Sequence, residues 1–189
     1  LRENDKKYVN IRSERVKKIA EAASMMANVD YEMELISGIY EILPNRFGAG
    51  IIQNNFELLG EIKYTDSEID YANTILKETG KELKGLDGNI KPLRPTLPAQ
   101  GGSTDVGDVS QVVPVVRLRT TTAAKDGPWH SWAVVACTGM SIGHKGMIYA
   151  SKALAMTMLD LYKNPKLIDG VRKEFLVRKG DRVYVPQIP

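Results

Sequence analysis

Cysteine, long apolar runs and an excess of one charge are nearly absent from this sequence, and each absence excludes a class of protein. Cys137 is the only cysteine, so the chain cannot form an internal disulfide or a cysteine-rich metal cage, which favours a reducing compartment, the cytoplasm. The longest apolar run, at 132–137, is far shorter than the roughly 20 residues of a membrane helix, and no targeting segment is visible. Lysine and arginine number 26 against 23 acidic residues, without the clustering typical of nucleic-acid-binding proteins. We therefore expect no membrane span and no nucleic-acid partner.

The remaining composition is typical of a globular protein. Of the 189 residues, 43% are hydrophobic and 26% are charged, and a chain of this length can bury a core without disulfides or metal ions. The first residue is Leu1 rather than methionine. We therefore expect this chain to be a portion of a longer protein.

The first 42 residues predict an incomplete unit. Between 16 and 27, apolar residues recur three and four positions apart, which predicts an amphipathic helix. Apolar residues at 29, 31, 33 and 35 then alternate with acidic ones, the pattern of a strand with one solvent-exposed face. If an earlier strand ends near Leu1, the unit is a strand-helix-strand piece that is too small to be stable alone.

Helices and strands alternate in the rest of the sequence. Apolar periodicity predicts helices near 45–59, 65–79, 142–162 and 166–178, and the spacing of Thr65 and Glu68 predicts a capping box. The β-branched segment 112–121 and the apolar segment 132–137 predict two strands. The proline-rich and glycine-rich segment 81–111 predicts a long irregular loop. This order of elements indicates an α/β fold.

Two histidines are the first candidates for chemistry. His130 and His144 both lie in glycine-flanked segments between predicted elements, and a neutral imidazole is the commonest metal ligand. Imidazole together with carboxylate suits zinc or manganese. The alternatives are structural: His130 would pack beside Trp129 and cap a turn, and His144 would begin a helix after Gly143.

The loop at 101–110 contains two aspartates between glycines. Asp105 and Asp108 could bind a metal, orient a histidine or cap the turns that the glycines form. The loop is not a P-loop, because it lacks the Gly-Lys-Ser/Thr ending. A nucleophilic triad lacks support as well, since no Gly-x-Ser-x-Gly sequence is present. Cys137, in an apolar segment, is predicted to be buried and inert.

Three short motifs occur together in this sequence. They are Gly-Ser-Thr-Asp-Val-Gly-Asp-Val-Ser at 102–110, Pro-Trp-His-Ser-Trp at 128–132 and Ser-Ile-Gly-His-Lys-Gly-Met at 141–147. In this order they resemble the C-terminal part of the p-aminobenzoyl-glutamate hydrolase group. That group is part of the two-metal amidohydrolase and peptidase family, with aminoacylase, hippurate hydrolase and the glutamate carboxypeptidases. The resemblance extends over essentially the whole chain.

The resemblance implies an α/β catalytic domain that holds two divalent metal ions, zinc or manganese, and a smaller inserted lid or dimerisation domain. Residues 1–42 would be the end of the lid, and residues 43–189 the C-terminal part of the catalytic domain. The implied substrate is an N-acyl amino acid or peptide-like small molecule, such as an aminobenzoyl-glutamate-like amide. The implied partner is a second copy of the chain or a paralogous subunit.

The family's motifs also imply roles for single residues. His130 matches a metal ligand, and Arg2 matches the lid arginine that binds the substrate carboxylate by a bidentate contact. Asp105 matches the aspartate of the Gly-Ser-x-Asp loop near the metal site, although many relatives carry glutamate where this chain has Thr104. His144, in the Gly-His-Lys-Gly motif, is assigned to substrate contact.

Two motifs of the family have no counterpart in this sequence. They are a His-x-Asp pair of metal ligands and a Glu-Glu pair whose first member is the general base. We therefore expect no catalytic residue in this chain and no activity from the chain alone. Two hypotheses follow for the full-length protein: a metal-dependent amidohydrolase, and a non-catalytic subunit or assembly module. A generic binding domain is a third, if the three motifs coincide by chance.

Overall fold

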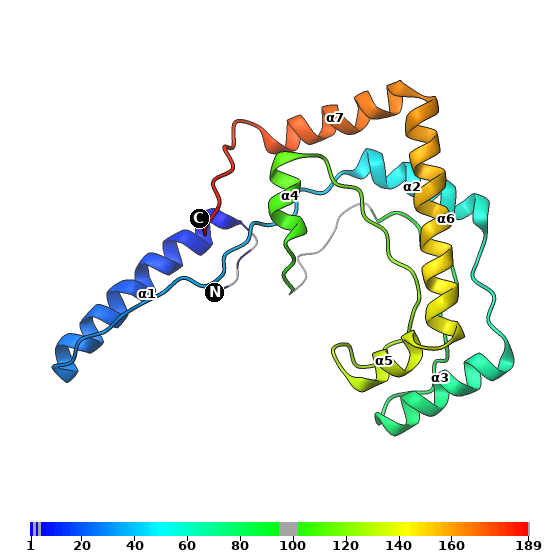
Figure 1. Cartoon of the computed structure of the whole chain (residues 1–189), viewed down its shortest axis with the longest axis horizontal. Helices are drawn as coiled ribbons and strands as arrows, with labels where there is room; N and C mark the ends of the chain where they lie inside the picture. The colour runs from blue at the N-terminus through cyan, green and yellow to red at the C-terminus, as the bar shows by residue number, and fades with distance from the viewer. Residues whose placement is uncertain (2, 4, 95–101, 189) are drawn as a thin grey trace. The chain divides into compact units, whose positions relative to one another are not determined.

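The computed structural model describes residues 1, 3, 5–94 and 102–188. This part of the chain contains seven helices, shown in Figure 1. They are α1 (Lys6–Ala27), α2 (Arg46–Leu59), α3 (Asp66–Glu78), α4 (Val106–Val112), α5 (Trp132–Thr138), α6 (Ser141–Lys163) and α7 (Pro165–Lys179). None of these helices combines the length and the hydropathy needed to cross a membrane.

The chain divides into two compact units. Unit 1 consists of residues 1–45, 96–115 and 172–189, and unit 2 consists of residues 46–95 and 116–171. The domain boundary after residue 42, which the family resemblance implies, stays a prediction.

The predicted α/β fold is wrong, because the described residues form helices and no strand. The segments 29–35 and 112–121 are both predicted as strands, but Val112 is the last residue of α4, and residues 29–35 and 113–121 have no regular secondary structure (Figure 1). A strand is held by hydrogen bonds to a neighbouring strand, and the residues described here supply no such neighbour. The carbonyl of Thr121, for example, accepts a hydrogen bond from the hydroxyl of Tyr64 at 3.2 Å instead.

The apolar run at 132–137, predicted as a strand, is helix α5. Ala133 and Cys137, four residues apart, are 3% and 0% exposed, whereas Val135 between them is 72% exposed. A short continuous apolar run does not distinguish a strand from a buried helix by its periodicity. Packing against α3 and α6 decides the outcome here. The prediction that Cys137 is buried is confirmed.

The longer periodic segments give the predicted helices. The segments near 45–59, 65–79, 142–162 and 166–178 are confirmed as α2, α3, α6 and α7, and the segment 16–27 is the second half of α1. Helix α1 begins earlier because Asp5 caps it, accepting a hydrogen bond from the backbone N–H of Lys7 at 2.8 Å. The predicted loop 81–111 contains one helix that the sequence did not indicate, α4, whose glycine and β-branched residues have low helix propensity.

In unit 1, Glu41 connects the start of α1 to the C-terminal segment. Its side chain accepts hydrogen bonds from the backbone N–H of Lys6 at 3.1 Å and from Arg182 Nη1 at 2.8 Å. The backbone carbonyl of Glu41 accepts a third, from the buried side chain of Gln111 in α4 at 2.7 Å. One residue therefore binds three parts of the chain that are far apart in sequence.

In unit 2, α6 packs against α2 and α5, and α5 packs against α3. The contact between α2 and α6 includes a buried polar group. Asn55 is 1% exposed, and its amide donates to Thr157 Oγ1 at 3.0 Å and to Asp160 Oδ2 at 2.8 Å. Because both partners lie on α6, this amide fixes α2 against α6 with a specific orientation.

We expect Asn55→Ala to lower the free energy of unfolding of the protein by about 2 kcal/mol, because it leaves the Thr157 and Asp160 oxygens without their donor. Urea unfolding, followed by circular dichroism, measures this loss. Gln53→Ala is the matched control on the same helix, since it removes only an exposed amide that donates to Glu57 at 3.1 Å. It should change stability by less than about 0.5 kcal/mol. Equal effects of the two substitutions would contradict the assignment.

Candidate functional site

Three of the four predicted site residues lie in the described part of the chain. Asp105 is in unit 1, and His130 and His144 are in unit 2. Arg2 lies outside the described residues, so its contact with a substrate carboxylate stays a prediction.

His130 lies in a turn whose backbone is fixed on both sides. Before it, the N–H of Gly127 donates to the carbonyl of Ala124 at 3.2 Å. After it, the hydroxyl of Ser131 donates to the carbonyl of Pro128 at 2.6 Å. The two bonds enclose His130 between a tight turn and the start of α5.

A second pair of contacts ties this turn to the segment that follows α3. The backbone N–H of Lys125 donates to the carbonyl of Gly85 at 2.9 Å. Lys84 Nζ lies 2.9 Å from Asp126 Oδ2, and this hydrogen bond keeps the pKa of Asp126 below its ordinary value. The turn is thus attached to the body of unit 2 at adjacent residues.

The backbone of His130 is in the left-handed region, with φ of 59°. This conformation costs a residue with a side chain about 1 kcal/mol, although histidine adopts it more often than most residues do. The imidazole is exposed and makes no hydrogen bond or ion pair with the described residues. The side chain is therefore free to bind a group from elsewhere, and the predicted packing role is not needed to account for its position.

The described residues do not form a metal site by themselves. No group of three or more histidine, cysteine, aspartate or glutamate side chains in this part of the chain could hold a metal ion. Protein metal sites of the zinc type use three or four such ligands. The role of His130 as a metal ligand therefore stays a prediction, and the described residues do not supply the further ligands that such a site needs.

The third motif, at 141–147, joins the start of α6 to the start of α3. Ser141 Oγ donates to Glu68 Oε1, and Lys145 Nζ donates to Glu68 Oε2, both at 2.6 Å. Glu68 also accepts the backbone N–H of Thr65 at 2.7 Å, so the predicted capping box is confirmed. Two residues of this motif thus have a structural role.

Glu68 stays ionised down to low pH. Burial alone would raise its pKa, but hydrogen bonds from Lys145, Ser141 and the Thr65 backbone lower it to about 2. Burial, with the negative charge of Glu68 nearby, raises the pKa of Tyr64 to about 12. Lys145 Nζ lies 5.5 Å from the centre of the Tyr64 ring, which adds a cation–π contact to the ion pair.

The two glycines of the same motif are needed for close packing. A Cβ atom at Gly143 would overlap the carbonyl of Thr138, and one at Gly146 would overlap the carbonyl of Thr121. His144 lies between these glycines, and its side chain is exposed and without a polar contact to the described residues. It is therefore the polar side chain of this motif that remains available to a ligand.

The first motif, at 102–110, also contains one exposed acidic side chain and one that is held by hydrogen bonds. Asp105 precedes α4, but its side chain makes no capping hydrogen bond and is exposed. Thr104 Oγ1 instead accepts the N–H of Val106 at 3.4 Å. The side chain of Asp105 thus does not cap α4, and its carboxylate is exposed.

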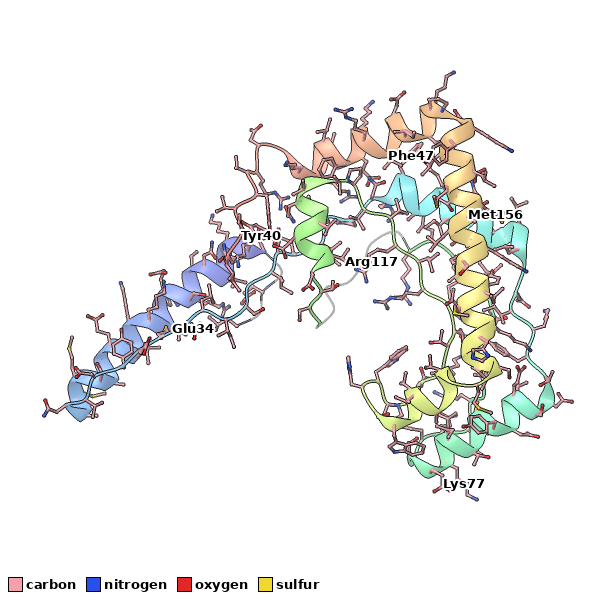
Figure 2. All side chains as sticks on the ribbon, in the orientation of Figure 1. Glu34, Tyr40, Phe47, Lys77, Arg117 and Met156 are labelled. Carbon is pink, nitrogen blue, oxygen red and sulfur yellow. The ribbon has the colours of Figure 1, made fainter. Side chains whose placement is uncertain are left out.

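Asp108, by contrast, is held by segments far away in the sequence. Its Oδ1 accepts the hydroxyl of Tyr184 at 3.1 Å, and its Oδ2 accepts the backbone N–H of Tyr40 at 3.3 Å; Tyr40 is labelled in Figure 2. A Cβ atom at Gly107 would overlap the carbonyl of Tyr40. With the hydrogen bond from Gln111 to the carbonyl of Glu41, these contacts attach α4 to the rest of unit 1.

Two residues close to His130 were not predicted as site residues from the sequence. Trp129 and Trp132 are 69% and 55% exposed, although tryptophan is highly buried on average. They are the only two tryptophans in the chain. The signal for them was the Pro-Trp-His-Ser-Trp motif itself, which places both indoles within two residues of the predicted ligand.

Comparison with curated proteins finds two similar hydrolases. The chain is 28% identical, over 201 aligned positions and 93% of its length, to a subunit of p-aminobenzoyl-glutamate hydrolase from Escherichia coli (strain K12). It is 38% identical, over 114 residues and 56% of its length, to the Xaa-Arg dipeptidase of the mouse, Mus musculus. The chain spans less than half the length of these relatives, 42% and 26% respectively.

No family profile and no solved structure matches the chain. The resemblance predicted from the three motifs is nevertheless confirmed by the curated relatives, both of which are named as hydrolases. The chain is therefore similar over nearly its whole length to part of an enzyme of the amidohydrolase and peptidase type.

We expect the stability of the protein to fall as the pH is lowered from about 4.5, the ordinary pKa of a glutamate, to about 2, the pKa of Glu68 in the folded state. The unfolded state takes up this proton first, because its carboxyl has the higher pKa. Glu68→Gln should be less stable at neutral pH and should lose less stability over this pH range.

Unfolding midpoints in urea, measured from pH 5 down to pH 2, test this dependence. Glu78→Gln on the same helix is the control, because Glu78 is exposed and makes no polar contact with the described residues. This control should keep the acid dependence of the wild type. An identical acid dependence in Glu68→Gln would show that Glu68 is not the responsible group.

Proposed function

We propose that the protein to which this chain belongs is a metal-dependent amidohydrolase. It would cleave the amide bond of an N-acyl amino acid, such as an aminobenzoyl-glutamate-like substrate, or of a similar peptide-like molecule. The similarity of 93% of the chain to a p-aminobenzoyl-glutamate hydrolase carries this proposal. The similarity to a Xaa-Arg dipeptidase supports the same class of bond.

In this proposal His130 supplies one ligand to a site of two zinc or manganese ions. An exposed imidazole without a polar contact to the described residues, in a turn that is fixed on both sides, supports this role. The remaining ligands and the general base would lie outside this chain, which is consistent with the lack of any group of three or more possible ligands among the described residues.

Three further residues are proposed to contact the substrate. Asp105 and His144 have exposed side chains with no polar contact to the described residues. Asp105 follows Thr104, which binds the backbone N–H of Val106, and His144 precedes Lys145, which binds Glu68. Arg2, which lies outside the described residues, is proposed to bind the carboxylate of the amino acid. A guanidinium can do so by two parallel hydrogen bonds.

The proposed protein acts in the cytoplasm and assembles as a homodimer or with a paralogous subunit. The presence of only one cysteine in the 189 residues given supports a reducing compartment. The E. coli relative is named as one subunit of its hydrolase, which supports an assembly of more than one chain.

The same name also favours a second candidate function, a non-catalytic subunit that holds a catalytic partner. Thr104, at the position where the family's motif implies a glutamate, supports this alternative. Purified full-length protein that hydrolyses p-aminobenzoyl-glutamate without any partner would exclude it.

The role of His130 is tested in the full-length protein with His130→Ala and His130→Asn. Asparagine tolerates the left-handed backbone, so it removes the imidazole while preserving the turn. Both variants should lose about one bound metal ion per chain and lower the rate of p-aminobenzoyl-glutamate hydrolysis by about 100-fold or more. Elemental analysis of the purified protein and a hydrolysis assay measure the two effects.

Asp126→Asn is the matched control for this experiment. Asp126 lies in the same turn and has the same left-handed φ of 59°, but it pairs with Lys84 on the surface. This control should keep its metal content and its rate. The proposal is wrong if His130→Asn also retains both.

A further inference from the structure

The two tryptophans of unit 2 are large apolar side chains that folding leaves uncovered. Trp129 and Trp132 are 69% and 55% exposed, and His130 lies between them in sequence. Tryptophan is enriched among the residues that contribute most to binding surfaces. The position of the two indoles beside the proposed metal ligand indicates what they would bind.

Both indoles are attached to a stiff part of the unit. Trp132 is the first residue of α5, and the next residue, Ala133, belongs to the buried cluster formed with Ile75 and Cys137. Trp129 borders a small hollow lined by apolar groups that include Ile75 and Ala133. The hydrogen bond of Ser131 with Pro128 fixes the backbone between the two rings. A surface held in this way loses little freedom when it binds a ligand.

Apart from His130 and Ser131, the segment that carries this surface has apolar side chains and the two indoles. The segment 127–136, which carries both tryptophans, contains no lysine, arginine, aspartate or glutamate. The charged residues just before it are paired with others, Asp126 with Lys84 and Lys125 with Asp87. Such a surface does not suit the carboxylate end of an N-acyl amino acid. It suits an aromatic ring, which can stack on an indole or meet it edge to face.

We propose that Trp129 and Trp132 bind the aromatic acyl group of the substrate and so make the enzyme prefer aromatic over small aliphatic acyl groups. This inference rests on the proposed amidohydrolase function. It adds the acyl-group specificity and the two residues responsible for it. The scissile amide, which joins the acyl group to the amino acid, would then lie beside His130.

The test compares two substrates with the same amino acid and different acyl groups, p-aminobenzoyl-glutamate and N-acetyl-glutamate. In the wild-type full-length protein, kcat/KM should be higher for the aromatic substrate. Trp129→Leu and Trp132→Leu keep an apolar side chain but remove the ring. At least one of them should lower the preference for the aromatic substrate about 5- to 10-fold, through a higher KM.

Two controls separate ring binding from folding. The phenylalanine variant at the same position should recover most of the preference, because it restores an aromatic face. Val135→Ala changes another exposed apolar residue of α5, 72% exposed, and should leave the preference unchanged. Thermal unfolding of each variant shows whether the fold is retained.

The outcomes distinguish this inference from the function on which it rests. If the wild type cleaves neither substrate, the proposed function fails and the inference falls with it. If the wild type cleaves both but both tryptophan variants lose the two activities equally, the indoles pack against another polypeptide and the inference alone is overturned. A wild type without an aromatic preference overturns it as well.

Discussion

The carboxylate of Glu68 is the group on which the arrangement of unit 2 depends. It closes the capping box of α3 and accepts hydrogen bonds from Ser141 and Lys145 at the start of α6. Helix α5 packs against both of these helices. The position of α5, and of the turn before it that carries His130, therefore follows from the way Glu68 joins α3 to α6. A buried charge is stable in this place only because each of its oxygens is paired.

Unit 1 uses two carboxylates for a similar purpose. Glu41 binds the start of α1 and Arg182, and Asp108 binds the backbone of Tyr40 and the hydroxyl of Tyr184. Helix α4 has little intrinsic tendency to form, so the contacts of Asp108, and the hydrogen bond from Gln111 to the backbone carbonyl of Glu41, help to account for its presence. They also determine where the exposed carboxylate of Asp105 lies, because Asp105 immediately precedes α4.

The three motifs share one design. In each, glycines and hydrogen-bonded polar residues hold the backbone, and one aspartate or histidine side chain is exposed without a polar contact to the described residues. Asp108 and Gly107 hold the first motif, Ser131 the second, and Lys145 with two glycines the third. The exposed groups are Asp105, His130 and His144. A rigid backbone around a free polar group is what substrate or metal binding requires, since the group is then positioned before the ligand arrives.

The sequence by itself determined the helices with long apolar periodicity and local caps, as at Thr65, because these depend on residues three or four positions apart. It also indicated His130, His144 and Asp105 through their motifs. Only the tertiary structure decided that 132–137 is a helix and that 29–35 and 113–121 do not pair with another strand. The conformation of a short apolar or β-branched run depends on the segments that pack against it. The role of Asp108 was likewise beyond the sequence, since its partner Tyr184 lies 76 residues away and only folding brings the two together.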